Sequence, residues 1–321
     1  FLIIVLAQVV FAFAGHNLVH EFEKYAFPYL AIVFGIAAIL IFGQAHLGQG
    51  VNARVQGPLG ETGAFTLTFT AAFGYAVGWN PYASDYTRYL PSRTSQFLTG
   101  LWAGLGVFVS CAILEVMGAA LVTIPATAGL SNPTDQLIEP LPGLLAGLVL
   151  LGVALGAVTA NVLNVYSGAI SFLTLGIRLP LRIRRAAVAL GAGVIGYIVG
   201  VVLESRVGPG SGYENFLLLI SYWIAPFLAV VLTDYWLRGG QYAEREFFDT
   251  SHRPWRGAVS MVVGIGASFL FWNNALITGP IPKAYPAVGD ITFIVGFIAT
   301  AVVYWALSQF AGSPDPEKTP A

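Results

Sequence analysis

Long runs of apolar residues separated by short polar segments dominate this chain. Runs that could each cross a bilayer as a helix, which takes about 20 residues, lie at 27–43, 64–82, 97–125, 143–176, 186–203, 213–237, 257–277 and 286–311. A shorter run, 1–14, is expected to be the end of a truncated span and brings the predicted number to nine. The runs are continuous and do not alternate, and only helices and closed barrels cross a bilayer. The pattern therefore predicts an all-α polytopic membrane protein.

Composition supports this class and excludes others. Of the 321 residues, 56% are hydrophobic and 10% are charged, whereas a soluble domain carries about 25% charged residues. The net charge of −1 gives no indication of nucleic-acid binding. The single cysteine, Cys111, excludes a disulfide framework within the chain. Because the chain begins at Phe1 without a basic segment, we interpret it as a fragment that lacks its N-terminus and not as a signal peptide.

The basic residues predict the orientation. If nine spans alternate, 12 of the 15 Lys and Arg residues fall on one side and 3 on the other. The richer side is expected to be cytoplasmic. We therefore predict a transmembrane domain over 1–312, a disordered cytoplasmic tail over 313–321, and a multi-pass membrane protein with a cytoplasmic C-terminus.

One stretch, residues 74–88, combines helix-breaking residues with aromatic and amide groups. Gly74 and Gly78 precede Trp79, Asn80 and a proline, and proline in a helix removes a backbone hydrogen bond. Freed backbone is tolerated at membrane depth where it lines a wet cavity, and transporters bind substrate on such broken helices. The stretch is therefore predicted to break a helix beside a cavity. An ordinary kinked helix that ends in a wet turn is the alternative.

A second polar group lies within the run 143–176. Asn161 and Asn164 are three residues apart and share a helix face with Thr159 nearby. Their amides either join neighbouring helices or read the donor and acceptor edge of a ligand. We favour the second interpretation because three polar residues gather on one span.

Charged residues near or within the spans form a third group. Glu115 lies well inside its run and is either a structural carboxyl, the interpretation that we favour, or a candidate for ion coupling or proton relay. Asp85 and Arg88, three residues apart just after the predicted break, are interpreted as an ion pair that is either a gate or purely structural.

Enzymatic chemistry is not indicated. The four histidines are scattered without metal-ligand spacing, and neither a phosphate-binding loop, a nucleophile elbow nor paired catalytic carboxylates appear. We predict no catalytic residue, no metal site and no cofactor. A membrane-embedded enzyme and a non-transporting receptor remain the alternatives to a transporter, and the oligomeric state is open.

Three segments of the chain resemble the purine–cytosine permeases of the nucleobase:cation symporter family. They are residues 78–88, 161–167 and 15–25, of which the first is the most specific. The resemblance implies a twelve-helix transporter of the amino-acid and nucleobase symporter type, with five-plus-five inverted repeats, of which this chain supplies about helices four to twelve. It also implies import of a nucleobase or a related heterocycle such as hydantoin or allantoin, coupled to sodium ions or protons by alternating access.

The resemblance assigns roles to individual residues. The family's ligand stacks between aromatics of helices three and six and bonds to an asparagine of helix eight. The stacking position falls on Trp79, with Tyr75 one turn earlier as the alternative and Gly78 and Asn80 beside it. The amide position falls on Asn164, with Asn161 as its neighbour. The hydroxyl at the cation site falls on Thr159.

Overall fold

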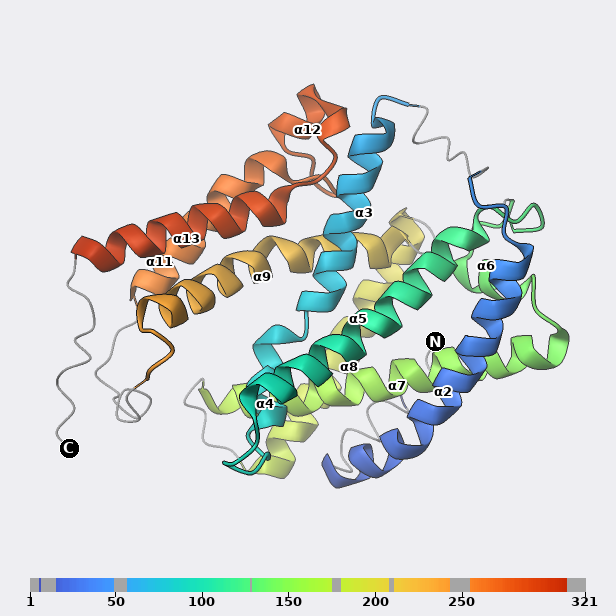
Figure 1. The fold of residues 1–321 in the computed structure, drawn as a ribbon, viewed down its shortest axis with the longest axis horizontal. Helices are drawn as coiled ribbons and strands as arrows, with labels where there is room; N and C mark the ends of the chain where they lie inside the picture. Colours follow the sequence, from blue (N-terminus) through green and yellow to red (C-terminus); the bar gives the residue numbers. More distant parts are fainter. Residues whose placement is uncertain are drawn as a thin grey trace. The chain divides into compact units, whose positions relative to one another are not determined.

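We analysed the protein in a computed structural model (Figure 1), which describes residue 6 and residues 16–48, 57–127, 129–174, 180–207, 211–242 and 255–310. The described part is helical, and its only extended pairing is an isolated bridge between Asn273 and Thr278. The longer helices are α2 (His16–Gln44), α3 (Gly60–Val77), α5 (Gln96–Leu121), α7 (Gly143–Thr174), α8 (Leu181–Val207), α9 (Ser211–Leu237), α11 (Trp255–Ser268) and α13 (Thr292–Phe310). The shorter elements are η1 (Asn80–Tyr82), α4 (Ala83–Thr87), α6 (Pro133–Ile138), η2 (Phe269–Phe271), α12 (Pro280–Ala284) and η3 (Pro286–Val288).

Five described helices are long and apolar enough to cross a membrane. They are Glu23–Gln44, Gln96–Leu121, Gly143–Ser171, Gly212–Leu237 and Thr292–Phe310, and two shorter apolar helices cover Ala186–Val202 and Trp255–Phe271. The prediction of an all-α polytopic membrane protein is confirmed. The predicted span 64–82 corresponds to α3, a helix with several threonines and glycines that is not among these five. The predicted first span, apart from residue 6, and the predicted tail lie outside the described residues.

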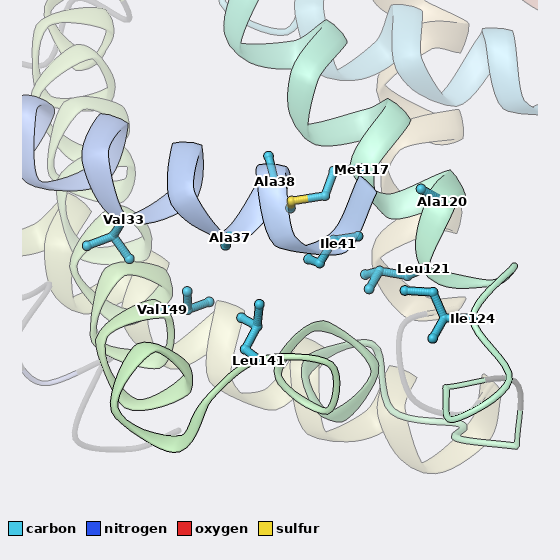
Figure 2. Close-up of a cluster of buried hydrophobic side chains, with 10 residues drawn as sticks. All are labelled: Val33, Ala37, Ala38, Ile41, Met117, Ala120, Leu121, Ile124, Leu141 and Val149. Carbon is cyan, nitrogen blue, oxygen red and sulfur yellow. The ribbon is translucent and has the colours of Figure 1, made fainter. Parts of the chain in front are cut away.

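The chain divides into two compact units. Unit 1 comprises Phe1–Gly50 and Tyr82–Gly212, and unit 2 comprises Val51–Pro81 and Tyr213–Ala321. The core of unit 1 lies where α2 packs against α5 and α7 (Figure 2). Small and branched side chains fill it, among them Ala37, Ile41 and Val149, each with no exposed surface. Alanine on α2 leaves room for the neighbouring helices to approach closely, as in other membrane helix pairs.

In unit 2, α11 packs along α13 (Figure 1). The contact is close because both helices carry glycine there. A Cβ atom built on Gly264 of α11 would lie only 1.8 Å from the Thr300 hydroxyl oxygen of α13. A Cβ atom on Gly296 of α13 would lie 3.4 Å from that of Ser268. A side chain at Gly264 would push the two helices apart, whereas one at Gly296 would press first on Pro226 of α9, at 3.2 Å.

The helix α3 is held to the rest of unit 2 by hydroxyl groups and by close backbone contacts. The Thr66 hydroxyl donates to the carbonyl of Val288 at 2.7 Å, and the Thr70 hydroxyl donates to the carbonyl of Asp290 at 2.6 Å. Between these two carbonyls, Gly289 has a φ of +65°, and a Cβ atom there would lie 2.1 Å from the Thr66 hydroxyl oxygen. Glycine is therefore required at position 289 both by the backbone angle and by the space.

Gly74 allows the closest approach between α3 and α9. It is buried, and a Cβ atom on it would lie 2.2 Å from the carbonyl oxygen of Leu217. We therefore predict that Gly74→Ala lowers the free energy of unfolding by about 1–3 kcal/mol, the usual cost of forcing extra atoms into a packed site. Thermal or denaturant unfolding of the purified full-length protein in nanodiscs measures this change.

Gly104→Ala on α5 is the matched control, because a Cβ atom there would meet no atom within 4 Å. Alanine is the better helix former by about 1 kcal/mol, so this variant should be as stable as the wild type or slightly more so. Equal effects at positions 74 and 104 would contradict the role of Gly74 in packing.

Candidate functional site

The predicted helix break is present. The helix α3 ends at Val77, the amide of Gly78 donates to the carbonyl of Gly74 at 3.2 Å, and the chain continues through the 3₁₀ turn η1 into the five-residue helix α4. The two glycines, counted above among the helix-breaking residues, do not break the helix by unusual backbone angles. Gly78 has ordinary helical angles, φ −53° and ψ −24°, so it does not open the backbone. Gly74 serves packing against α9, as described above.

The side chains around the break belong to unit 2 and differ in exposure. Trp79 is half-buried, whereas Tyr75 and Asn80 are exposed within this chain, Tyr75 by 41%. The aromatic faces and the amide that the sequence singled out are thus on or close to the surface of this unit. Whether they line a cavity stays a prediction.

The polar group on α7 belongs to unit 1. Asn161 is half-buried and Asn164 is exposed. The Thr159 hydroxyl donates to carbonyls of its own helix, at 2.9 Å to Gly156 and 3.2 Å to Leu155. Because the proton of this hydroxyl is used within the helix, its oxygen lone pairs remain to accept a bond or to contact a cation.

The segment after the break is held on α7 by phenol groups and not by the predicted ion pair. The Tyr86 hydroxyl lies 3.3 Å from the Oγ atom of the buried Ser167, and the Tyr89 and Tyr166 hydroxyls are hydrogen-bonded to each other. Burial is the main cause that raises the pKa of the Tyr86 phenol above its ordinary value, so the group stays protonated and can donate at neutral pH.

Asp85 and Arg88 form no salt bridge in the described part of the chain, unlike Lys24–Glu21 and Arg238–Asp234. The Arg88 guanidinium lies instead 6.0 Å from the centre of the Tyr89 ring. A role of Asp85 and Arg88 as a gate stays a prediction.

The predicted site residues are divided between the two units. Tyr75, Gly78, Trp79 and Asn80 belong to unit 2. Thr159, Asn161 and Asn164 belong to unit 1, together with Asp85, Arg88 and Glu115, which is exposed on α5. Within unit 1, the structure brings the segment that carries Asp85 onto the helix that carries the asparagines. Among the residues that the structure describes, no three His, Cys, Asp or Glu side chains gather where they could hold a metal ion.

Sequence reasoning missed a buried carboxylate in unit 2. Asp290 has no exposed surface and lies two residues before the start of α13. Its carboxylate accepts hydrogen bonds from the Tyr222 hydroxyl at 2.6 Å, from the backbone amide of Thr292 at 2.9 Å and from that of Asn273 at 3.2 Å. Tyr222 also stacks on Trp272, with ring centres 4.7 Å apart. Asp290 lies in the apolar run 286–311, so the rule that selected Glu115 could have selected it too.

A second carboxylate–tyrosine pair joins the same two helices further along. The Tyr304 hydroxyl of α13 donates to Asp234 of α9 at 2.6 Å, and Asp234 also pairs with Arg238 at 3.0 Å. In these two pairs α9 supplies Tyr222 and Asp234, while Tyr304 of α13 and Asp290 just before it are their partners. The two helices are therefore joined at two levels. This arrangement follows from the pairing of distant segments and has no local pattern in the sequence.

The fold and the composition together define a multi-pass, all-α membrane protein. Residues 1–296 match the family described as permeases for cytosine/purines, uracil, thiamine and allantoin, and the chain belongs to this family. The family suspected from residues 78–88 and 161–167 is thereby confirmed.

Curated relatives that match the chain are named as permeases and not as enzymes. The chain is 28% identical to the putative purine-cytosine permease YxlA of Bacillus subtilis over 92% of its length and 65% of that protein. It is 29% identical to the purine-cytosine permease fcyB of Emericella nidulans, over 96% of the chain and 62% of that protein. The chain thus spans less than two thirds of the length of these relatives. No solved structure matches the chain significantly.

The buried network around Asp290 makes a prediction for stability. We expect Asp290→Asn to lower the free energy of unfolding by about 3 kcal/mol, because an amide cannot replace the carboxylate oxygens for all three donors and leaves buried groups unpaired. Thermal unfolding of the full-length protein in nanodiscs provides the measurement.

Asp135→Asn is the control, since Asp135 is exposed on the short helix α6. Its effect should stay within about 0.5 kcal/mol, as is usual for surface substitutions. If Asp290→Asn were as mild as Asp135→Asn, the network would not hold the unit together.

Proposed function

We propose that the complete protein is a secondary active transporter that imports a nucleobase or a related heterocycle, of the cytosine, purine or hydantoin and allantoin type, together with a cation by alternating access. The observation that carries this proposal is the match to a permease family over residues 1–296. The broken helix with an aromatic and an amide at the break supports it, because transporters place their substrate on discontinuous helices.

The chemistry of a nucleobase explains why these residue types suit it. Its ring has two broad π faces and an edge of donors and acceptors. Stacking on an aromatic side chain is worth about 1–3 kcal/mol per base and tolerates the identity of the base. We assign this contact to Trp79, with Tyr75 as the alternative and with Gly78 and Asn80 beside it. Selectivity at the ring edge then falls to Asn164, which is exposed within unit 1, and to Asn161.

The coupling cation is proposed to be Na⁺ or H⁺. Thr159 is the candidate for a contact to Na⁺, because its hydroxyl proton is used within α7 and its oxygen lone pairs remain available. Glu115 on α5 is the candidate for a proton. Its exposure within this chain suits a group that exchanges protons with water or with another part of the complete protein.

The same proposal covers the orientation of the transporter, the membrane in which it lies and its partners. The asymmetric distribution of basic residues favours a cytoplasmic C-terminus, and import of a nutrient base places the protein in the plasma membrane. The partners are then the small substrate and the lipid bilayer.

Uptake by cells that express the full-length gene tests the function. Radiolabelled cytosine, adenine, uracil and allantoin should be compared in a sodium buffer, in a sodium-free buffer and after collapse of the proton gradient. Accumulation of one class of base that depends on one of the two ions is the expected result. Binding without accumulation would instead identify a non-transporting receptor, and chemical conversion of the base would identify an enzyme.

The stacking role predicts a graded response at position 79. Trp79→Ala should weaken the binding of all transported bases together by about 5- to 100-fold, the loss expected for one stacked ring. Trp79→Phe keeps a flat ring and should retain much of the affinity. Trp102→Ala on α5 is a control for loss of an exposed tryptophan, since Trp102 is 69% exposed. Competition binding on the full-length protein measures all three.

If Tyr75→Ala abolishes binding while Trp79→Ala does not, the stacking residue lies one turn earlier. If neither substitution matters, the proposed stacking role of this stretch is wrong.

The amide role predicts a selective loss at position 164. Asn164→Ala should weaken binding of the preferred base by about 10- to 100-fold, because the ring edge then loses its hydrogen-bond partner. Leucine has a volume similar to that of asparagine but, like alanine, lacks the amide. Asn164→Leu should therefore bind the base as poorly as Asn164→Ala. Unchanged affinity of either variant for every base would remove Asn164 from the site, whereas rescue by leucine would show that the residue only packs.

A further inference from the structure

The two parts of the broken helix belong to different units of the chain: α3 lies in unit 2 and α4 lies in unit 1. Unit 2 ends at Pro81 in this region, and unit 1 resumes at Tyr82. The break between α3 and α4 therefore coincides with the boundary between the units. The two halves of this helix are held by different partners, which can be described separately.

The first half, α3, is fastened within unit 2. Its Thr66 and Thr70 hydroxyls bond to the carbonyls that precede α13, at 2.7 Å and 2.6 Å. Gly74, one turn before the end of α3, packs against the backbone of Leu217 on α9. These contacts reach to within one turn of the break.

The second half, α4, has five residues. A helix of this length is not stable by itself, because helix formation needs a costly nucleus, so its position depends on contacts to its neighbours. The Tyr86 hydroxyl supplies one contact, at 3.3 Å to Ser167 Oγ and 3.5 Å to the carbonyl of Leu163. The Tyr89 hydroxyl supplies another, to the hydroxyl of Tyr166.

All of these partners lie on α7 within one helical turn of Asn164. Ser167 is three residues after Asn164, and residues at this spacing lie on neighbouring positions of one helix face. Asn161, Asn164 and Ser167 thus continue one polar stripe, and Tyr86 covers its last, fully buried member. The stripe that we propose to read the base is therefore in direct contact with the segment that follows the break.

We propose that Tyr86 and Tyr89 are positioning residues that latch α4 to the asparagine-bearing turn of α7, so that during transport α4 follows α7 and not α3. This proposal rests on the proposed transport function. The hinge is then the stretch from Gly78 to Pro81, which connects the two separately held halves. Asp85 and Arg88 form no salt bridge in the described chain, whereas the phenols of Tyr86 and Tyr89 form hydrogen bonds that join this segment to α7.

Hydrogen exchange of the full-length protein in nanodiscs tests the latch without any transport measurement. Tyr86→Phe should speed the exchange of amides in residues 83–90 by about 3- to 10-fold, the factor that follows from the loss of one ordinary hydrogen bond. Amides of α3 should keep their wild-type rates. Tyr82→Phe is the matched control, a neighbouring tyrosine for which the structure gives no hydrogen bond, and it should leave both segments unchanged.

Ser167→Ala removes the same bond from the other side and provides a second measurement if Tyr86→Phe does not fold. It should speed exchange in residues 83–90 by a similar factor, and the double variant should add little, since both changes break one interaction. Wild-type exchange in both variants, or faster exchange spread evenly over α3 and α4, would overturn the latch.

Transport kinetics then test whether the latch contributes to transport. In Tyr86→Phe, the uptake rate per folded protein should fall by about 3- to 10-fold, while the equilibrium affinity for the transported base changes by less than about twofold. Equal losses of rate and affinity would indicate a merely structural role and would overturn the positioning role. If the wild type neither binds nor transports a base, the proposed function fails, but the exchange experiment still decides on the latch.

Discussion

Within a bilayer every polar group must find its partner inside the protein, and this constraint shapes each part of the chain. Water is absent from the hydrocarbon region, so unpaired backbone and side-chain groups are costly there. Three threonines of the described chain satisfy this constraint, because the hydroxyls of Thr66, Thr70 and Thr159 all donate to backbone carbonyls. The buried carboxylate of Asp290 obeys the same constraint with three donors. The polar residues of this protein therefore hold its segments together by hydrogen bonds, and some are also candidates for contact with the substrate or the ion.

Close approach between helices is the second consequence, because helices in lipid gain stability from packing and not from hydrophobic burial. Glycines provide the space. Gly264 lets α11 approach α13 closely, and Gly74 brings α3 onto α9. The tyrosine–aspartate pairs between α9 and α13 then fix these neighbours in register at two levels. Unit 2 thus combines small residues that permit contact with hydrogen bonds that specify it.

These contacts decide which part of the protein holds each part of the broken helix. Hydroxyls and glycine contacts hold α3 in one unit, whereas phenols hold α4 on α7 in the other. The aromatic group before the break therefore belongs to unit 2, and the asparagines on α7 belong to unit 1.

The sequence by itself determined the class of the protein, most of its spans, the position of the helix break and the family. Long apolar runs and the proline after Gly78 act locally, so their consequences can be predicted without knowledge of the fold. The roles of individual polar residues were not determined in this way. Gly74 was counted among helix-breaking residues and is a packing contact, the ion pair of Asp85 and Arg88 is not formed, and Asp290 was overlooked. Each of these depends on which distant segment lies opposite, such as Leu217 for Gly74 or Tyr222 for Asp290. Only the tertiary structure decides that, because hydrogen bonds and close contacts act over a few ångströms between residues far apart in the chain.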